Sequence, residues 1–357
     1  MKIGLLINLQ AGRGPAYNRM FVATQLPRLF SGLRALMPVT AVLVPAESPA
    51  AIIARENSIP LVTLAITPRG NRDETVTAVR LACQAGAEVL VVVGGDGTLA
   101  DAALGILLAQ KMLPAVGVGT KVRLLGVGIG TTNVGALVAF KGEELAGATA
   151  VQLDQWLQSL QPFKPPALVA GVADEILGVG FNDCTLGFTV PATVQGQRLD
   201  VDAAAMMAGR HEQGTVRPVG GPETEVWLRR KQQPLLVARG CEAGQIIIGT
   251  VDERYIGKAV AGGVCLTALA RAPAALVVAD KPLTRINLDA GKMEAVEPVT
   301  TRCFSLSTGD RVAVKGLLDN TVICVDGNPL SKVSGEQEVT VAVDTGLVTC
   351  LKPVNKH

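Results

Sequence analysis

The sequence predicts two domains, an α/β domain built on a parallel sheet and an all-β domain that follows it. Three observations lead to this prediction. In the first part of the chain, short runs rich in valine and leucine alternate with segments of helical periodicity, which is the pattern of βαβ units. Beyond residue 166, short apolar runs of near-alternating character follow one another between turn signals. The length of 357 residues is too great for one ordinary domain and sufficient for two.

A proline-rich stretch at residues 161–166 breaks any helix and marks the linker between the domains. We expect the α/β domain at residues 1–140, a helix and linker at 141–166, and the β-rich domain at 167–357. The first domain is expected to hold a Rossmann-like parallel sheet with right-handed crossovers. The second is expected to be a sandwich or a layered sheet.

Strands and helices alternate along the first domain. Pro27 is expected to kink or break the first helical segment. The acidic pair Asp73-Glu74 suits the first turn of a helix, where negative charge is favourable. The expected strands cover residues 2–8, 39–44, 61–66, 88–93 and a run that begins at 124, and the expected helices cover 16–36, 48–56, 73–85, 99–111 and 142–160.

Turn and hairpin signals such as Asp319-Asn320 and Asp344-Thr345-Gly346 separate the apolar runs of the second domain. Only residues 200–209 have helical character there. The expected strands cover 167–172, 176–180, 184–190, 225–229, 234–239, 245–251, 274–279, 311–315, 321–326 and 337–343.

Composition and charge exclude several classes of function. The net charge of +2 gives no basis for a nucleic-acid partner. Hydrophobic residues make up 48% and mean hydropathy is +0.36, yet no unbroken apolar run reaches about 18 residues, so we expect no membrane partner. The seven cysteines are odd in number and lack a C-x-x-C pair, which argues against disulfides and structural zinc. Together with the lack of a signal peptide, this predicts a cytoplasmic protein.

The chain is organised around the turn Gly94-Gly95-Asp96-Gly97-Thr98, which directly follows a buried strand and opens a helix. Its glycines let the backbone approach a ligand closely, and the first amides of the helix are able to face an anion. Asp96 and Thr98 add a carboxylate and a hydroxyl, which suits a phosphate with a metal ion beside it. A turn of this composition also occurs without a ligand, with Thr98 as a helix cap.

This five-residue string resembles the nucleotide motif of the superfamily of NAD kinases, diacylglycerol kinases and sphingosine kinases. A second passage, Gly130-Thr131-Thr132-Asn133, follows another strand and resembles the Gly-Thr-x-Asn motif of the same superfamily. Its hydroxyl and amide groups are expected where a nucleotide would lie across the carboxyl ends of the strands. The glycines within residues 117–130 could equally mark a loop.

The first loop carries a weaker resemblance to the Asn-Pro-x-Ser-Gly-x-Gly opening of the lipid kinases. Asn8, Gly12 and Gly14 match that pattern, whereas Leu9 replaces its proline and Ala11 its serine. An ordinary turn between the first strand and helix is the alternative interpretation.

In the second domain, Asn182-Asp183 resembles the Asn-Glu/Asp pair with which NAD kinases hold nucleotide hydroxyls. A plain β-turn is the alternative. Asp326-Gly327 resembles the late Asp-Gly turn of the superfamily's sheet domain, where the role is structural, although a carboxylate there could support a metal. The two histidines, His211 and His357, make a histidine-based triad or metal site unexpected.

Over nearly its full length the chain resembles an ATP-NAD kinase-type protein with an NAD kinase/phosphofructokinase-like first domain. The Met-Lys-Ile-Gly-Leu opening and the Gly-Ile-Gly-Thr-Thr-Asn-Val-Gly passage resemble the acetoin catabolism protein X branch most closely. One departure concerns the acceptor. NAD kinases carry a Gly-Ser-Thr-Ala-Tyr run that contacts the dinucleotide, and the nearest glycine-rich passage here, residues 249–258, lacks it. That difference puts NAD itself in doubt as the acceptor.

The resemblance implies a kinase that uses ATP with Mg²⁺ and phosphorylates a hydroxyl of NAD or a related small molecule. Asp96 would be the catalytic group, either as the base or as a metal ligand. Asn182 and Asp183 would orient the acceptor. The implied ATP and phosphate contacts are Gly94, Gly95, Gly97, Thr98, Gly130, Thr131, Thr132, Asn133 and Asn8, and the candidates for acceptor specificity are Asp252, Arg254 and Lys258.

Two other functions stay open, and we also expect a homo-oligomer. A non-catalytic nucleotide-binding regulatory protein would account for the missing acceptor motif. A lipid kinase would account for the Asn8 loop and the apolar composition, although the chain lacks a basic amphipathic helix for a membrane surface.

Overall fold

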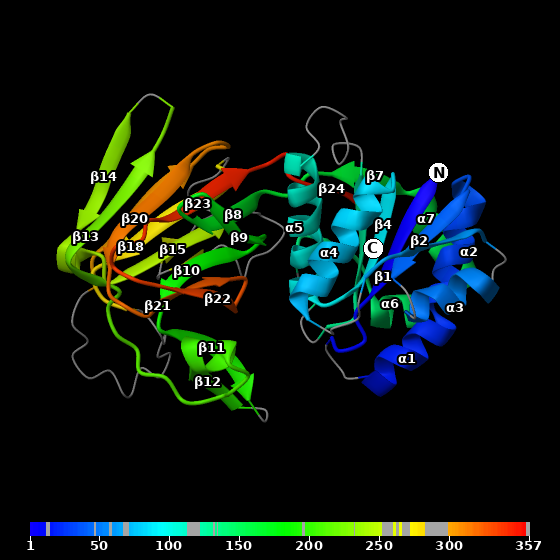
Figure 1. Ribbon diagram of the computed structural model, residues 1–357, viewed down its shortest axis with the longest axis horizontal. Helices are drawn as coiled ribbons and strands as arrows, with labels where there is room; N and C mark the ends of the chain where they lie inside the picture. The colour runs from blue at the N-terminus through cyan, green and yellow to red at the C-terminus, as the bar shows by residue number, and fades with distance from the viewer. Residues whose placement is uncertain are drawn as a thin grey trace. The chain divides into compact units, whose positions relative to one another are not determined.

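The computed structural model describes residues 1–11, 15–45, 48–56, 59–66, 71–112, 122–130, 133, 135–194, 197–231, 233–251, 260–261, 264–265, 272–282 and 299–354. The chain forms two compact units (Figure 1). The first contains Met1–Pro165 together with Gly346–His357, and the second contains Pro166–Thr345. The boundary therefore lies within the proline-rich stretch that marks the linker in the sequence.

An eight-stranded, mostly parallel sheet forms the centre of the first unit, in the order β3-β2-β1-β4-β5-β24-β7, with β6 paired to β5. The chain runs outward from β1 to β3, then returns to the other side of β1 and continues with β4 and β5. The order thus reverses between β1 and β4, as in doubly wound folds. The strands are β1 (Lys2–Ile7), β2 (Ala41–Pro45), β3 (Leu61–Leu64), β4 (Val89–Gly94), β5 (Arg123–Gly128), β6 (Val138–Lys141), β7 (Leu160–Phe163) and β24 (Thr349–Pro353).

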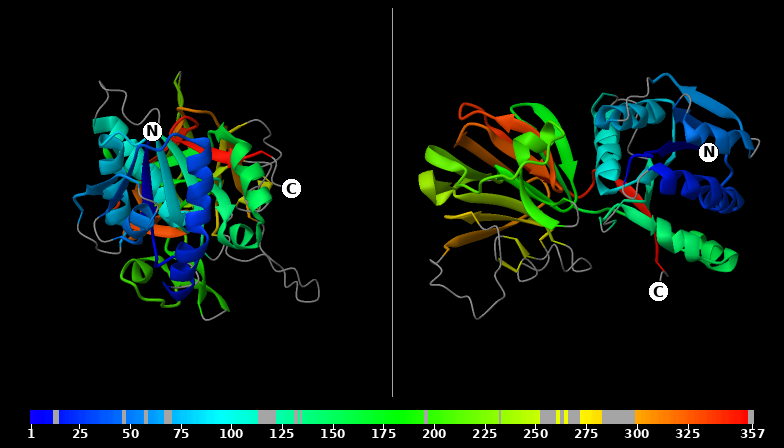
Figure 2. Two further views of the ribbon diagram at one scale, coloured as in Figure 1. Left: turned by 90° about the vertical axis from the view of Figure 1, so that its right-hand side faces the viewer. Right: turned by 90° about the horizontal axis from the view of Figure 1, so that it is seen from below.

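Helices cover both faces of this sheet, because strands buried on both sides present apolar side chains to both (Figure 2). On one face, α1, α2, α3, α6 and α7 share a core with alternate residues of β1, β2, β4 and β5. On the other, α4 and α5 pack against the strands and against each other. The helices are α1 (Pro15–Thr24), α2 (Leu26–Leu36), α3 (Pro49–Glu56), α4 (Arg72–Gln84), α5 (Asp96–Met112), α6 (Gly142–Gly147) and α7 (Ala150–Gln158).

Two long helical segments expected from the sequence are each divided in two. Residues 16–36 form α1 and α2, and Pro27 lies in the first turn of α2, where the missing N–H is tolerated. Of the expected helix 142–160, Leu160 already belongs to β7, and residues 142–158 contain α6 and α7. Thr149 starts the second of these, because its hydroxyl accepts a hydrogen bond from the Gln152 N–H at 3.2 Å in a capping box.

The C-terminal strand β24 belongs to the first unit, which corrects the expected extent of the second domain. β24 pairs in parallel with β5 and antiparallel with β7, so residues 346–357 leave the β-rich unit to which the sequence assigned them. Leu351 of this strand is buried in the core of the first unit. β7 contains Pro162 and lies at the sheet edge, the position where a strand tolerates proline.

The second unit is a sandwich of two six-stranded antiparallel sheets that enclose one apolar core. One sheet contains β14 (Pro234–Arg239), β13 (Gly220–Arg229), β20 (Arg311–Leu317), β23 (Val339–Asp344), β8 (Ala167–Val172) and β9 (Glu175–Gly180). The other contains β19 (Thr301–Leu306), β18 (Ala274–Ala279), β15 (Gln245–Thr250), β10 (Asp183–Gly187), β21 (Thr321–Val325) and β22 (Asn328–Val333).

Smaller elements complete the second unit. The hairpin of β11 (Thr189–Val194) and β12 (Gln197–Asp202) leads into the short helix α8 (Ala203–Met207), within the segment expected to be helical. The expected strand 184–190 is divided, since β10 ends at Gly187 and β11 begins at Thr189. Among the described residues of this unit, the remaining elements are a one-turn 3₁₀ helix at Gly240–Glu242 and the two-residue strands β16 (Val260–Ala261) and β17 (Val264–Cys265).

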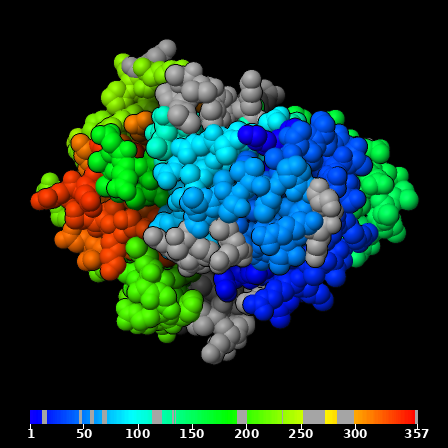
Figure 3. Space-filling view, turned by 45° about the vertical axis from the view of Figure 1, so that its right-hand side comes forward, coloured from blue at the N-terminus to red at the C-terminus, as the bar shows by residue number. Residues whose placement is uncertain are grey.

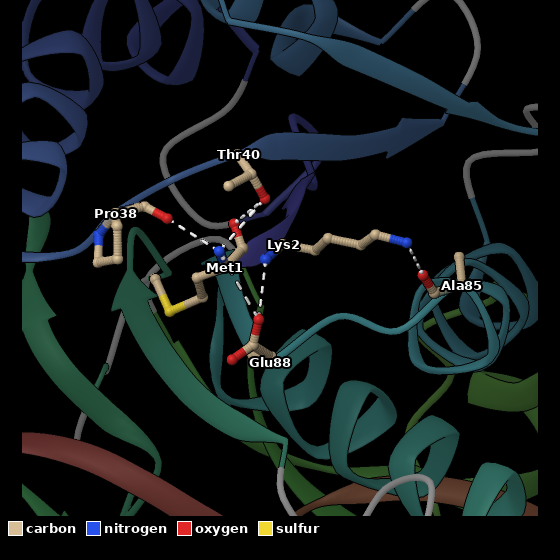
Figure 4. Close-up of polar contacts among 6 residues, drawn as sticks. All are labelled: Met1, Lys2, Pro38, Thr40, Ala85 and Glu88. Atoms are coloured by element: carbon tan, nitrogen blue, oxygen red, sulfur yellow. Dashed lines mark hydrogen bonds and ion pairs between the residues drawn. The ribbon is translucent and has the colours of Figure 1, made fainter.

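The amino edge of the first sheet is held by polar contacts around Glu88 (Figure 4). Its carboxylate accepts the Lys2 N–H at 3.2 Å and lies 3.8 Å from the Met1 ammonium group. The Lys2 ammonium group donates to the Ala85 carbonyl at 2.9 Å, at the C-terminal end of α4, where positive charge is favourable. These contacts join the beginnings of β1 and β4.

The predicted fold class, a parallel α/β domain followed by an antiparallel β domain, is confirmed. Blue to cyan atoms in Figure 3 mark the N-terminal part of the first unit, where it faces the viewer. Within the part of the chain that the structure describes, every helix is too short or too polar to cross a bilayer.

The placement of β24 predicts that Leu351→Ala destabilises the first unit by about 2–4 kcal/mol, because a buried leucine is replaced by a cavity. The chain has two tryptophans, Trp156 in the first unit and Trp227 in the second, so fluorescence can follow each unit separately in Trp227→Phe and Trp156→Phe backgrounds. In Leu351→Ala, the denaturation midpoint reported by Trp156 fluorescence should fall, and the midpoint reported by Trp227 fluorescence should be unchanged. Val343→Ala in β23 is the matched control and should show the reverse pattern.

Candidate functional site

The carboxyl ends of β1 and β4 lie side by side at the point where the strand order reverses. Asn8 follows β1, and its N–H donates to the Val93 carbonyl at 2.9 Å. Its side-chain amide donates to the Thr98 hydroxyl at 2.9 Å, so the two strand ends are also joined through side chains. In open α/β sheets, ligands bind in the crevice at such a reversal point.

The turn after β4 is as short as a strand-to-helix turn can be. β4 ends at Gly94 and α5 begins at Asp96, with Gly95 between them. The first bond within the helix runs from the Leu99 N–H to the Gly95 carbonyl at 3.1 Å. A Cβ atom on Gly94 would lie 2.5 Å from the Thr98 Cβ, so glycine is required there. The N-terminus of α5 therefore lies directly at the end of β4.

A second glycine passage after β5 packs against this turn. The Ile129 N–H donates to the Gly94 carbonyl at 2.9 Å, and a Cβ on Gly130 would lie 2.9 Å from the Gly95 Cα. Asn133 has a positive φ of 46° and closes the passage, because its Oδ1 accepts the Gly130 N–H at 2.7 Å. The two glycine segments thus form a floor of bare backbone.

Asp96 links the two segments. Its Oδ1 accepts the Gly135 N–H at 2.9 Å, and a Cβ on Gly135 would lie 2.5 Å from that oxygen. The side chain is half-buried rather than sealed inside the unit. A carboxylate with partial access to solvent therefore stands beside the first turn of α5 and the glycine floor.

A cavity of about 210 Å³ opens beside Asn8 and Thr98. It lies at the carboxyl ends of β1 and β2 and is bounded by the N-terminal turns of α3 and α4. The Ser48 hydroxyl in its wall is buried and lacks a hydrogen-bond partner among the described residues. The cavity is lined by Leu6, Ile7, Asn8, Leu9, Gln10, Pro45, Ser48, Pro49, Asn71, Glu74, Thr75, Ala78 and Thr98.

An ion pair fixes the wall of this cavity to α5. Arg72, the first residue of α4, donates through Nε to the Asp101 carboxylate at 2.7 Å. Burial raises the pKa of Asp101 from 3.8 to about 6, although the Arg72 guanidinium opposes the rise. The Asp101 carboxylate is thus held in the fold against a large desolvation penalty.

In the second unit, Asn182 and Asp183 lie where the chain passes from β9 of one sheet to β10 of the other. The backbone N–H groups of Phe181, Asn182 and Asp183 all donate to the Asp326 carboxylate, at 2.8, 2.7 and 3.0 Å. The Thr250 hydroxyl donates to the Phe181 carbonyl at 2.8 Å. This is more than a plain β-turn, since groups from two other segments, at Asp326 and Thr250, hold it.

The structure brings together most residues that the sequence singled out. In the first unit these are Asn8, Gly94, Gly95, Asp96, Gly97, Thr98, Gly130 and Asn133, and in the second Asn182 and Asp183 form one turn. Thr131, Thr132, Gly12, Gly14, Asp252, Arg254, Lys258 and His357 lie outside the described residues.

Sequence reasoning missed Gly135 as the partner of Asp96, the cavity wall around Ser48 and Asn71, and the three bonds made by Asp326. The Asp-Gly pair at 326–327 was a visible turn signal, but nothing local indicated what its carboxylate contacts. Among the residues that the structure describes, no three side chains of the metal-binding types histidine, cysteine, aspartate or glutamate gather at one place.

Comparisons with known proteins place the fold. No family model matches the chain. A curated protein of Archaeoglobus fulgidus, described only as uncharacterized, is 29% identical over 357 residues, which is 100% of both chains. The solved structure of yeast NADH kinase complexed with NADH is 15% identical, with a TM-score of 0.51 over 100% of this chain and 84% of that one.

A second solved structure gives a similar match. A protein from Bacillus anthracis strain Sterne, assigned as a diacylglycerol kinase, is 12% identical, with a TM-score of 0.51 over 99% of this chain and 98% of that one. The chain therefore shares the fold of these two proteins. The NAD kinase-like fold expected from the motifs is confirmed.

The raised pKa of Asp101 predicts an unusual pH dependence of stability. Because the folded-state pKa of about 6 exceeds the unfolded value, the contribution of this group is fully present below pH 3.8 and is lost as pH rises through 6. The difference between the two values corresponds to roughly 3 kcal/mol. In the Trp227→Phe background, the free energy of unfolding of Asp101→Asn minus that of the parent should rise by about this amount between pH 4 and pH 7.

A difference that stays flat across this range would contradict the assignment. Arg72→Met serves as the companion variant, because removing the guanidinium takes away the influence that lowers the Asp101 pKa. In Arg72→Met, the free energy of unfolding should therefore continue to fall to a higher pH than in the parent.

Proposed function

We propose that this protein is an ATP-dependent phosphotransferase that phosphorylates a hydroxyl group of NAD or a related small molecule. The observation that carries the proposal is the half-buried carboxylate of Asp96 at the N-terminus of α5, beside a floor of glycine backbone at the point where the strand order reverses. The fold shared with an NADH kinase and a protein assigned as a diacylglycerol kinase supports it.

The first unit suits the phosphates of ATP. The opening turn of α5 directs backbone N–H groups and the positive end of the helix dipole toward the crevice. Gly95 and Gly130 leave the space that side chains would fill. The adjoining cavity, with its polar Asn8, Ser48 and Thr98, has room for part of a nucleoside.

The donor set also fits Mg²⁺, which binds through one or two carboxylates and completes its shell with water and phosphate oxygens. Asp96 is the residue that would hold it. When bound, the ion neutralises charge on the phosphates. No larger protein cage is required for that role.

The reaction asks little covalent chemistry of the protein. The oxygen of the acceptor hydroxyl forms a bond to the γ-phosphorus, the bond from that phosphorus to the β–γ bridging oxygen breaks, and ADP leaves. The hydroxyl proton passes to a base. Asp96 either accepts this proton or holds the metal, while the glycine floor and the amides of α5 fix the phosphates.

On the acceptor side, we propose that Asn182 and Asp183 bind hydroxyl groups. Their turn is held from two sides, by Asp326 and by Thr250, which suits the precise placement of ligand groups. The structural match from yeast was solved with NADH. This chain lacks the Gly-Ser-Thr-Ala-Tyr run, so a screen must include acceptors other than NAD.

Several finer expectations stay predictions: membership of the acetoin catabolism protein X branch, a cytoplasmic location and a homo-oligomeric state. The two other functions are outcomes of the same assay. ATP binding without consumption for any acceptor would indicate a regulatory protein, and transfer to diacylglycerol in vesicles would indicate a lipid kinase.

The direct test is Asp96→Asn. The isosteric amide keeps an oxygen that can accept the Gly135 N–H, so the fold should hold, whereas proton transfer or metal binding is lost. We expect kcat for phosphoryl transfer to fall at least about 100-fold across NAD, NADH and small diols and sugars. Asp154→Asn, at an exposed position of α7, is the control and should match wild type. Equal transfer by Asp96→Asn and wild type would remove Asp96 from the mechanism.

The glycine floor makes a second prediction, measured by calorimetric titration with ATP and Mg²⁺. In Gly130→Ala, the new Cβ would lie 2.9 Å from the Gly95 Cα and must displace the floor. We expect ATP affinity to fall about tenfold or more. Gly147→Ala is the matched control, because a Cβ there has nothing within 4 Å. Unchanged affinity in Gly130→Ala would place the phosphates elsewhere.

A further inference from the structure

The Asp326 carboxylate is the meeting point of three backbone donors. Oδ2 accepts the N–H of Phe181, and Oδ1 accepts those of Asn182 and Asp183. A fourth hydrogen bond joins the same two segments, since the Asp326 N–H donates to the Asp183 carbonyl at 2.9 Å. Successive N–H groups that converge on one anion hold a backbone segment in a single shape.

Asp326 occupies this position in a rarely used backbone conformation. Its φ is 49°, and Gly327 after it has a φ of 76°. Non-glycine residues in the left-handed region persist where the surrounding contacts over-determine them, and they often lie at functional sites. The hairpin turn between β21 and β22 is thus strained at Asp326. The Asp326 carboxylate points toward the segment that follows β9.

Thr250, at the end of β15, holds the same segment from its carbonyl side. Its N–H donates to the Asn182 carbonyl at 2.8 Å and its hydroxyl to the Phe181 carbonyl at 2.8 Å. Thr250 is 1% exposed, so these bonds are shielded from water. Both polar edges of the Phe181–Asp183 backbone are therefore fixed by side chains distant in sequence.

The Asn182 side chain itself is not satisfied in the same way. Its Oδ1 is buried and has no hydrogen-bond partner among the described residues. A buried acceptor without a donor is unfavourable, and in a rigid, strained turn it indicates a group kept for a ligand. A ligand hydroxyl could supply the missing donor.

We propose that Asp326 is a positioning residue for the phosphate acceptor. It does not touch the acceptor; it holds the Phe181–Asp183 backbone so that the Asn182 and Asp183 side chains meet the acceptor hydroxyls. This inference rests on the proposed function and extends it to a residue 144 positions from Asn182 in sequence. Both oxygens of a carboxylate are needed, because an amide at this position has one acceptor oxygen for three donors.

The test is steady-state kinetics of Asp326→Asn with whichever of NAD, NADH, small diols or sugars wild type phosphorylates best. We expect the KM for the acceptor to rise about tenfold or more, while the KM for ATP stays within about twofold and kcat at saturating acceptor falls much less. Hydrogen exchange at the amides of residues 181–183 should become faster in the same variant.

Two further variants keep the test valid if Asp326→Asn folds poorly. Thr250→Val removes the hydroxyl that holds the opposite edge of the turn, and it should raise the KM for the acceptor in the same selective way. Thr250→Ser keeps the hydroxyl, so its KM for the acceptor should stay near that of wild type. Asp310→Asn is the control, because Asp310 is a buried carboxylate of the same unit that accepts the Ser307 N–H at 2.9 Å in another turn. It should lower stability and leave both KM values unchanged.

The outcomes separate this inference from the function on which it rests. If wild type transfers phosphate to no acceptor, the proposed function fails and the positioning role fails with it. If wild type is active but Asp326→Asn and Thr250→Val leave the KM for the acceptor within about twofold, only the positioning role is overturned. Faster exchange at residues 181–183 with an unchanged KM has the same meaning, since the turn would then be structural alone.

Discussion

The parallel pairing of β1 with β4 is the constraint on which the candidate site depends. Five residues of β1, Ile3 to Ile7, pair in register with Val89 to Val93, although about 85 residues of chain separate them. This pairing brings the Asn8 amide to the Thr98 hydroxyl and sets the N-terminus of α5 at the reversal of strand order. Apolar burial on both faces of the strands therefore decides where the polar groups meet.

The floor of the site is made of backbone, and this explains why a short string of sequence predicts so much of it. Gly94 to Thr98 are consecutive, and the conformation of a one-residue turn between strand and helix depends almost entirely on them. The Gly130–Asn133 passage is similarly local, with Asn133 closing a loop on a residue three positions away. The alternation of valine-rich runs and helical segments likewise fixed the order of β1 to β5, because each element is defined by its own periodicity.

What the sequence could not indicate depends on contacts between distant segments. Residues 349–353 were not among the expected strands, and only their pairing with the open edge of β5 shows that they join the first sheet. The cavity wall is assembled from the ends of two strands and the starts of two helices. Asp326 is 144 residues from Asn182, and the contact of its carboxylate with the Asn182 N–H depends on the register between β10 and β21. No local pattern carries such information, because registers arise from the packing of whole sheets.

The two aspartates of the candidate sites differ in their contacts, and this difference supports the roles that we propose for them. Asp326 accepts three backbone N–H groups through both of its oxygens, so its lone pairs are committed to holding a turn. Asp96 stands half-buried beside a helix N-terminus and a glycine floor, and its Oδ1 accepts the Gly135 N–H. A phosphate beside Asp96 would face the backbone N–H groups at the N-terminus of α5. We therefore propose the chemical role for Asp96 and the positioning role for Asp326.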